Sequence, residues 1–342
     1  MNTKYKVVRL NCKTRPTMEK EEDHLKKAGL DLIKVSGDEI TDENLDADAI
    51  MVESAKLPGE VINKLSKCKI ISRIGIGVDR IDIKAATDKN IIVTNVPNFC
   101  KSELADHTMA LILALARRLL QLDKGFREKD WSIRQKVNIQ RLDGKKIGFI
   151  GFGRLAIEVA LRSKAFGLNI FAYDPYVSEE IINSQGAVKV NSLEEIFSQC
   201  DIVTLHLPLN PDTFHLINES LLKKMKPTAI FINTARGSIV DEPALVKALA
   251  EGWIAGAGLD VFENMNLFEE VPTKQYCPFF QFDNVIVTPH SSPVSIEAIE
   301  EVTERAAKEV VRVLSGIKPE NIVNPEVLPK FTYLKEDRVI EL

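Results

Sequence analysis

The sequence has little that would suit a membrane protein or a nucleic-acid partner. Its 49 acidic and 45 basic residues give a net charge of −4, and neither half carries a basic block. The apolar run at 109–116 is cut off by Arg117 and Arg118, far short of the roughly 18 residues that a bilayer-spanning helix needs. We therefore expect no transmembrane helix, no membrane partner and no nucleic-acid partner.

Cysteine is also scarce. The chain contains an odd number, 5, with no C-x-x-C pair, which is typical of reduced thiols and not of disulfides or a zinc site. We expect no metal. The N-terminal stretch 4–10 alternates charged and apolar residues like a strand, where a signal peptide would have a continuous apolar core. A cytoplasmic location is the expectation. The cysteines are Cys12, Cys68, Cys100, Cys200 and Cys277.

The hydrophobic and charged fractions, 45% and 27%, are ordinary for a globular protein, and the 342 residues suggest two domains. Strand-like and helical stretches alternate along the chain, which predicts an α/β fold with parallel sheets covered by helices on both faces. A first doubly wound domain fills about the first hundred residues, with a helix at 18–28, and a second begins at the strand 146–150. The other expected strands are 7–10, 32–35, 49–52, 70–74 and 91–93 in the first domain and 170–173, 202–207, 229–233 and 285–288 in the second.

Two helices stand outside this simple alternation. The stretch 104–120 is apolar on nearly all faces, so we expect it to be buried between domains or between subunits. An irregular, charged stretch is expected at 123–141. The final helix, about 295–314, has apolar residues at helical spacing and is expected to return to the first domain.

A glycine-rich motif marks the start of the second domain. Gly151 and Gly153 follow the strand and Ala156 opens a helix, in the pattern G-x-G-x-x-A. Such a turn lets backbone N–H groups and a helix N-terminus meet a pyrophosphate. Asp174 ends the next strand, where an acidic side chain binds the ribose hydroxyls of NAD and repels the extra phosphate of NADP. The alternative is that the glycines only allow close packing and that Asp174 is a surface residue.

Two further side chains follow predicted strand ends. Arg236 could hold a carboxylate by two hydrogen bonds, and His290 could exchange a proton near neutral pH. Together they suit a 2-hydroxy or 2-oxo acid. The alternative is a structural ion pair for Arg236 and a turn position for His290.

The order of motifs along the chain resembles the D-isomer-specific 2-hydroxyacid dehydrogenases. The resemblance covers about residues 5–325 and implies two Rossmann-like doubly wound domains, the substrate domain being discontinuous (1–103 plus 295–330). It also implies an NAD-binding domain at 104–294 with the helix 104–120 at the interdomain and dimer region, a tail at 331–342, and a homodimer. The motifs are Gly75-Ile76-Gly77-Val78-Asp79, Asn95-Val96-Pro97, Ala105-Asp106-His107-Thr108, the glycine loop at 151–156, His206-Leu207-Pro208-Leu209, the block 233–242 and Thr288-Pro289-His290.

The same resemblance implies roles for individual residues. Arg236 would orient the substrate, His290 would be the general acid and base, and Asp260 would hold the nicotinamide carboxamide. Backbone N–H groups of the 75–78 loop would bind the substrate carboxylate, although this loop can also be a plain strand-to-helix turn. The implied cofactor-binding residues are Gly151, Gly153, Arg154, Leu155, Asp174, His206, Pro208, Thr234, Ala235, Arg236, Asp260, His290 and Thr108, and the substrate-binding residues are Ser54, Ile76, Gly77, Arg236 and His290.

The sequence departs from the family in two places. The glutamate that normally bonds the catalytic histidine is replaced by Met265, a thioether that cannot carry charge. Glu270, in the lengthened 263–284 loop, or Glu263 could substitute for it, or the acid could be absent. Glu53 stands where phosphoglycerate dehydrogenases carry an arginine, so we expect a substrate without a distal phosphate and hypothesise a polar or cationic tail, unless Glu53 points into solvent.

Two function classes follow from these residues. The first is an NAD-dependent oxidoreductase acting on a small D-2-hydroxy or 2-oxo acid. The second is an NAD(H)-binding sensor, similar to the corepressor branch of the family, which Met265 would favour. The presence of both Arg236 and His290 favours the enzyme.

Overall fold

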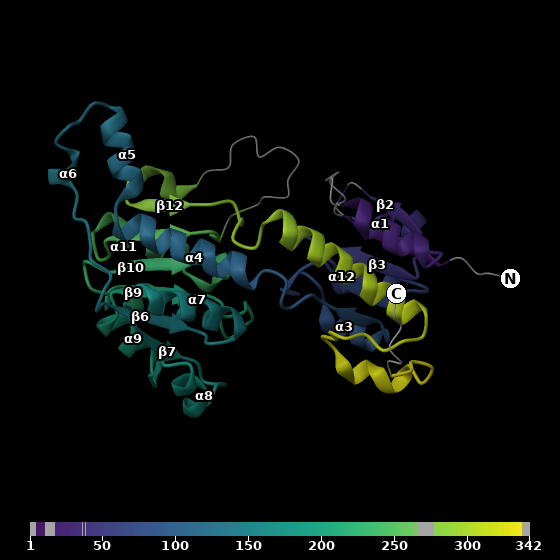
Figure 1. Ribbon diagram of the computed structural model, residues 1–342. Coiled ribbons are helices and arrows are strands. Elements are labelled where there is room, and N and C mark those ends of the chain that lie inside the picture. The colour runs from purple at the N-terminus through teal and green to yellow at the C-terminus, as the bar shows by residue number, and fades with distance from the viewer. Residues whose placement is uncertain are drawn as a thin grey trace. The chain divides into compact units, whose positions relative to one another are not determined.

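The structure is a computed structural model, which describes residues 5–10, 18–35, 37, 39–263, 265 and 277–336 (Figure 1). Its internal contacts divide the chain into two compact units. Unit 1 comprises Met1–Phe99 and Ser295–Leu342, and unit 2 comprises Cys100–Val294. Each contains one parallel sheet, which confirms the expected α/β class.

Unit 1 contains a five-stranded sheet in the order β2-β1-β3-β4-β5. Alternate strand residues face opposite helical layers: Val7 packs toward α12, whereas Val8 packs toward α2. The strands are β1 (Lys6–Leu10), β2 (Asp31–Lys34), β3 (Ala49–Val52), β4 (Ile70–Arg73) and β5 (Ile92–Thr94), and the helices are α1 (Met18–Lys27), α2 (Gly59–Lys64), α3 (Ile83–Asp88), α12 (Ile296–Leu314) and the 3₁₀ helices η1 (Asp42–Asn44) and η4 (Pro325–Lys330).

The C-terminal residues complete the core of unit 1. Ala306, Val310 and Val313 of α12 are fully buried beside α1, β3 and β4. Beyond η4, Phe331 is 8% exposed and joins the same cluster, and the backbone N–H of Lys335 donates to the carbonyl of Gly316. The segment from 331, expected as a tail, is therefore part of the unit as far as Glu336.

Unit 2 contains a seven-stranded parallel sheet in the order β12-β11-β10-β9-β6-β7-β8, so the direction of winding reverses between β6 and β9. Helices α4 and α7 cover one face, and α9, α10 and α11 cover the other. The strands are β6 (Lys146–Ile150), β7 (Asn169–Tyr173), β8 (Val188–Lys189), β9 (Ile202–Leu205), β10 (Ile230–Asn233), β11 (Gly256–Leu259) and β12 (Val285–Val287), and the helices are α4 (Lys101–Ala116), α5 (Leu119–Arg127), α6 (Ile133–Lys136), α7 (Arg154–Ala165), α8 (Glu179–Ser184), α9 (Leu193–Gln199), α10 (Glu219–Leu222), α11 (Glu242–Ala250) and the 3₁₀ helices η2 (Gly237–Ile239) and η3 (Pro278–Gln281).

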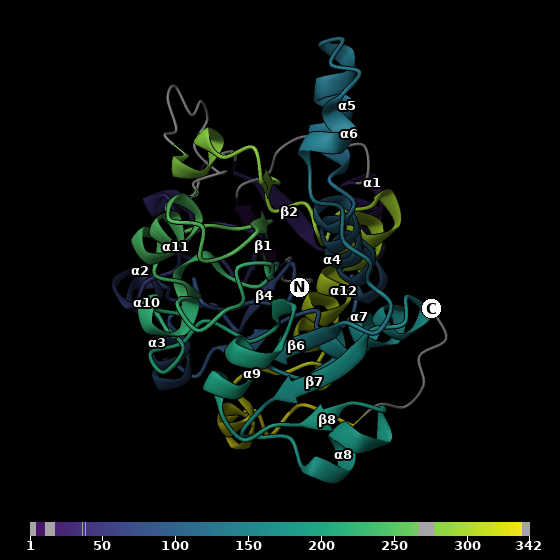
Figure 2. The same cartoon turned by 90° about the vertical axis from the view of Figure 1, so that its left-hand side faces the viewer.

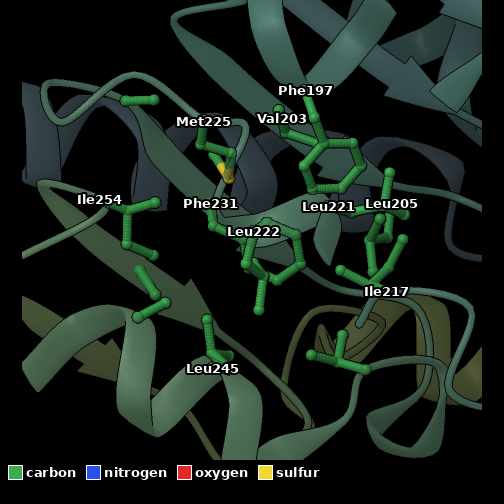
Figure 3. Close-up of a cluster of buried hydrophobic side chains, with 14 of the residues drawn as sticks. Phe197, Val203, Leu205, Ile217, Leu221, Leu222, Met225, Phe231, Leu245 and Ile254 are labelled. Carbon is green, nitrogen blue, oxygen red and sulfur yellow. The ribbon is translucent and has the colours of Figure 1, made fainter. Parts of the chain in front are cut away.

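Large apolar side chains fill the space between the sheet and α9–α11. Figure 3 shows Phe231 of β10 surrounded by Leu222 of α10 and Leu245 of α11, with Phe197 of α9 nearby. Each of these four side chains is 2% exposed or less. This packing fixes the strands whose ends carry the candidate site.

The expected helix at 104–120 is two helices. The chain breaks at Arg118, whose φ of 54° is left-handed and whose guanidinium donates to the carbonyls of Asn138 and Ala255. The burial of α4 is explained by its packing on β10–β12 and α7 within unit 2. The expected irregular stretch at 123–141 is partly helical, as α5 and α6, which extend beyond the sheet on the side away from β7 and β8 (Figures 1 and 2).

Strand β11 was not predicted because its sequence, Gly-Ala-Gly-Leu, lacks the bulky residues typical of strands. The small residues allow close packing. A Cβ at position 258 would lie 2.9 Å from Ile232 Cδ1 and 3.1 Å from Leu111 Cβ, so Gly258 allows α4 to approach the sheet.

Candidate cofactor and substrate sites

The candidate residues of unit 2 lie at one edge of its sheet. Strands β6, β7, β9, β10, β11 and β12 are parallel, and each is followed directly by candidate residues. Ligands of open α/β sheets bind at this carboxyl edge, at the point where the winding reverses. The structure therefore brings the cofactor candidates after β6 and β9 to the reversal point itself.

The glycine loop has the backbone that a dinucleotide site requires. Gly151 has a φ of 84°, and a Cβ there would lie 2.6 Å from the carbonyl oxygen of His206. Only glycine fits both demands. Gly153 precedes the first turn of α7, and a Cβ there would have open space within 4 Å, so the loop leaves room in front of the helix N-terminus. Arg154 and Leu155 form that first turn.

Asp174 is anchored at the end of β7. Its Oδ2 accepts the N–H of Phe152 at 2.8 Å, and its Oδ1 accepts the N–H of Tyr176 at 2.8 Å. The bond to Phe152, between the two loop glycines, fixes the carboxylate beside the glycine loop. This is the position at which a carboxylate can accept ribose hydroxyls.

His206 follows β9, on the other side of the reversal point. Its Nε2 lies 2.9 Å from Thr204 Oγ1, and its ring stacks on Phe149 with centroids 5.5 Å apart. Desolvation lowers the pKa of His206 to about 3, so the ring is neutral. Pro208 lies two residues on, where its carbonyl accepts a hydrogen bond from Thr213 Oγ1 at 2.7 Å.

The loop after β10 carries Thr234, Ala235 and Arg236. Asn233, the last strand residue, is 1% exposed, accepts the N–H of Ala235 at 3.0 Å and donates to the carbonyl of Arg236 at 2.9 Å. Thr234 Oγ1 lies 3.1 Å from Thr108 Oγ1 of α4. These bonds hold the backbone of the loop, and Arg236 Nη1 donates to the carbonyl of Ala235 at 2.8 Å.

Asp260 organises the turn that carries His290. The carboxylate is fully buried and accepts Thr288 Oγ1 at 2.6 Å, the N–H of Ser291 at 2.8 Å and the N–H of Ser292 at 2.9 Å. Burial alone would raise its pKa, but the hydrogen bonds from Ser292, Thr288 and Ser291 lower the pKa of Asp260 below its usual value. The site therefore holds a buried negative charge.

His290 sits in a strained backbone conformation within this turn. Its φ is 49°, and its N–H donates to the carbonyls of Asp260 at 2.9 Å and Thr288 at 3.0 Å. A left-handed conformation in a residue other than glycine is uncommon and is typical of functional sites. Asp260 thus fixes the backbone of His290 through its carbonyl and the backbone of the two following residues through its carboxylate.

A second histidine, not predicted from the sequence, reaches the same network. His107 Nε2 of α4 lies 3.0 Å from Thr288 Oγ1 and 3.5 Å from Asp260 Oδ1. Because Thr288 donates its own proton to Asp260, His107 must donate to Thr288, which places a proton on Nε2.

Of the two glutamates considered as replacements for the family glutamate, one has a different partner here. Glu263 Oε1 lies 2.8 Å from His215 Nε2, and the N–H of Glu263 donates to Glu242 Oε2 at 2.9 Å. The structure thus assigns Glu263 to His215. Met265 is half-buried, and Glu270 lies outside the described residues.

In unit 1, the loop after β4 has three backbone N–H groups in a row that donate to no acceptor among the residues that the structure describes. They belong to Ile76, Gly77 and Val78, which are all half-buried. Such a run of N–H groups forms a nest that can bind an anion. Ser54, the other substrate candidate of this unit, follows β3, and its carbonyl accepts a hydrogen bond from Arg80.

A buried charge cluster lies at the reversal point of the unit 1 sheet, between β1 and β3. Arg9, 2% exposed, is 3.1 Å from Glu53 Oε2 and 3.2 Å from Glu21 Oε1, and also donates to the carbonyl of Leu10. Glu21 is fully buried, and desolvation raises its pKa. Glu53 therefore does not simply point into solvent, since Arg9 holds one of its oxygens.

Other classes of site have less support. Within the described ranges, no group of three or more His, Cys, Asp or Glu side chains is arranged to hold a metal ion. No helix of the described part of the chain is long and apolar enough to cross a membrane. Among the described residues, Cys68, Cys100, Cys200 and Cys277 form no disulfide.

Comparison with known proteins agrees with this geometry. Residues 109–292 match the family model described as D-isomer specific 2-hydroxyacid dehydrogenase, NAD binding domain. The chain is 41% identical over 294 residues to a D-3-phosphoglycerate dehydrogenase of Methanocaldococcus jannaschii, covering 86% of this chain but 55% of the relative. It is 40% identical over 287 residues to a glyoxylate reductase of Thermofilum pendens, covering 83% of each.

A solved structure is similar over nearly its whole length. The D-lactate dehydrogenase of Aquifex aeolicus, complexed with NAD and lactic acid, has a TM-score of 0.85 at 30% identity, covering 93% of this chain and 98% of that one. This likeness confirms the expected Rossmann-like architecture, and the NAD-binding match covers most of unit 2. The chain belongs to the D-isomer specific 2-hydroxyacid dehydrogenase family.

Proposed function

We propose that the protein is an NAD-dependent oxidoreductase that interconverts a small D-2-hydroxy acid and its 2-oxo acid. The observation that carries the proposal is the convergence of the glycine loop, Asp174, Arg236 and His290 at one edge of the unit 2 sheet. The family supports the same chemistry. The chain spans only 55% of the length of the phosphoglycerate dehydrogenase relative, so we propose the activity of this protein from its own residues.

The residues present fit NAD. The open space in front of α7 accommodates a pyrophosphate at a helix N-terminus, and the fixed carboxylate of Asp174 suits ribose hydroxyls and disfavours a 2′-phosphate. When bound, the nicotinamide supplies or accepts the hydride. The residues proposed to hold the cofactor are Thr108, Gly151, Gly153, Arg154, Leu155, Asp174, His206, Pro208, Thr234, Ala235, Arg236, Asp260 and His290.

The remaining chemistry falls to the protein's own side chains. Arg236 provides a planar donor fork for the substrate carboxylate and the adjacent carbonyl. His290 gives a proton to the substrate oxygen during reduction and takes it back during oxidation. In unit 1, Ser54 and the N–H groups of Ile76 and Gly77 are the proposed substrate-binding groups.

For Asp260 the geometry supports a positioning role through the turn at 288–292. Its oxygens already accept hydrogen bonds from Thr288, Ser291 and Ser292, so a bond to the nicotinamide carboxamide would share these oxygens. Asp260 also keeps a buried negative charge beside the backbone turn that carries His290.

We further propose that the substrate lacks a distal phosphate. Glu53 lies directly after β3, and the carbonyl of Val52 accepts the N–H of Ile74, so position 53 borders the loop that carries the nest. Arg9 supplies a guanidinium near this position. This guanidinium is already paired with Glu53 and Glu21 and bonded to the carbonyl of Leu10. Because two carboxylates share one guanidinium, the cluster disfavours a substrate with a dianionic tail and suits one with a polar or cationic tail.

Exposed apolar residues support a homodimer. Leu119, Leu120 and Phe126 of α5 are 53%, 54% and 56% exposed, and Trp131 is 79% exposed. Apolar side chains gathered on one projecting segment are typical of an interaction surface. Light scattering of the wild type and of Trp131→Glu tests the homodimer. A wild-type protein that is a monomer contradicts it. We also propose a cytoplasmic location, supported by the described cysteines, which form no disulfide.

The test is NADH oxidation with a panel of 2-oxo acids: glyoxylate, pyruvate, hydroxypyruvate, its phosphorylated form, and a lysine-derived acid. We expect turnover of unphosphorylated acids that Arg236→Ala and His290→Gln abolish. A preference for the phosphorylated acid contradicts the assignment of Glu53. If NADH binds but no acid is reduced, the sensor alternative replaces the enzyme.

A further inference from the structure

The conformation of the loop after β4 is held by hydrogen bonds that its carbonyl groups accept. The carbonyl of Gly75 accepts the N–H of Val96 at 2.9 Å, that of Ile76 accepts Asn95 Nδ2 at 2.7 Å, and that of Gly77 accepts Arg73 Nε at 2.8 Å. The carbonyl of Ile74 also accepts a hydrogen bond from Arg73 Nη1. Four consecutive carbonyl groups are therefore bonded to the rest of unit 1.

Each carbonyl bond fixes the direction of the next N–H. In a planar trans peptide, the C=O of one residue and the N–H of the next point in opposite directions. Each carbonyl of Gly75, Ile76 and Gly77 points toward the group that donates to it. The N–H groups of Ile76, Gly77 and Val78 therefore point away from those donating groups. These are the same three N–H groups that form the nest.

Arg73 makes two of the four carbonyl bonds, and its guanidinium lies against Gly75. A Cβ at position 75 would be 2.5 Å from Arg73 Nη1, and Gly75 has a φ of 140°. The glycine thus makes room for the guanidinium within the loop. The half-buried arginine also places a permanent positive charge beside the nest.

We propose that Arg73 is a positioning residue for carboxylate binding: it holds the 74–78 loop in the conformation in which three N–H groups face an anion, and its charge strengthens that binding. This inference rests on the proposed function, in which the anion is the carboxylate of a 2-oxo acid. Arginine is required because its planar fork bonds two carbonyls while keeping its charge, whereas lysine supplies the charge without the fork.

The experiment measures binding of oxamate, an unreactive carboxylate, to the protein saturated with NADH, alongside steady-state reduction of a 2-oxo acid. The variants are Arg73→Met and Arg73→Lys. Arg305→Met is the matched control, because Arg305 lies in unit 1 on α12, is partly exposed and pairs with Glu301. Asn95→Leu, which removes the donor to Ile76, tests the nest by an independent contact.

We expect Arg73→Met to weaken oxamate binding and raise KM by about 10- to 100-fold, the effect of losing hydrogen bonds that involve a charged group. Because the loss is in binding, kcat at saturating substrate and the Kd of NADH should change much less. Arg73→Lys should recover part of the affinity, Asn95→Leu should raise KM in the same way, and Arg305→Met should match wild type.

Unchanged oxamate binding in Arg73→Met overturns the inference, as does a fall in kcat and NADH affinity equal to the change in KM. If Arg73→Met does not fold, Arg73→Lys decides, and wild-type affinity in that variant overturns the inference. A wild-type protein that neither binds oxamate nor reduces any 2-oxo acid overturns the proposed function instead.

Discussion

Replacing Asp260 by asparagine tests how the turn at 288–292 is held. The two carboxylate oxygens accept hydrogen bonds from the N–H groups of Ser291 and Ser292 and from the hydroxyls of Thr288 and Ser291. Asparagine keeps one oxygen but places an NH₂ group against the N–H of Ser292, which is 2% exposed. One charge-assisted bond is lost and one buried donor is left without an acceptor, so the free energy of unfolding should fall by about 2–4 kcal/mol.

The effect should also reach His290. The N–H groups bound by Asp260 belong to the two residues after His290, so its φ of 49° should relax and kcat should fall at least about tenfold. Urea unfolding at pH 7 and steady-state kinetics measure both effects. Asp283→Asn is the control, since Asp283 is an exposed partner of Lys124 and should leave both quantities unchanged.

The pH dependence of Asp260→Asn provides a second check. The pKa of Asp260 is lowered in the folded protein, so its contribution to stability is present above the unfolded pKa of about 3.9 and is lost as the pH falls through the folded pKa. The difference between wild type and variant should therefore shrink in acid. An unfolding free energy within about 0.5 kcal/mol of wild type at pH 7, with unchanged kcat, would refute the role assigned to Asp260.

Three further changes have definite expected results. Gly151→Ala should weaken NADH binding at least about tenfold in a fluorescence titration, because its Cβ would meet the His206 carbonyl; an affinity equal to that of the wild type would contradict the loop geometry. Asp174→Ala should raise NADPH-linked activity relative to NADH-linked activity about tenfold or more, and an unchanged ratio would exclude Asp174 as the discriminating residue. Between pH 7 and pH 5, wild type should lose about 2 kcal/mol of stability relative to His206→Gln, because the unfolded histidine takes up a proton that the folded one, with its pKa lowered to about 3, does not; parallel urea unfolding curves would disprove this.

Much of the fold and of the candidate site could be predicted because the informative residues lie close together in the sequence. Both sheets are buried on two faces, so their strands appear as short apolar runs, and candidate residues such as Asp174 directly follow such runs. Strand β11 was missed because Gly258 allows the approach of α4 and Gly256 that of the Asn284 carbonyl, and both contacts are with residues far along the chain. The break at Arg118 was missed because carbonyls of distant residues stabilise it.

The positioning contacts depend on tertiary structure and left no local pattern. Arg9 meets Glu53 because β1 and β3 pair with Leu10 opposite Val52. His107 reaches Asp260 only through the packing of α4 on the sheet. A sequence shows which residue types are available, but predicting such pairs requires knowledge of the strand order and of the helix positions.

Stereospecific oxidation of a 2-hydroxy acid tests the central claim most directly. NAD reduction would be followed with each enantiomer of a phosphate-free acid, such as lactate or glycerate, for wild type and Arg236→Ala. We predict NADH formation from the D enantiomer only, and none with Arg236→Ala. Equal rates for both enantiomers, or activity that survives loss of Arg236, would contradict the account.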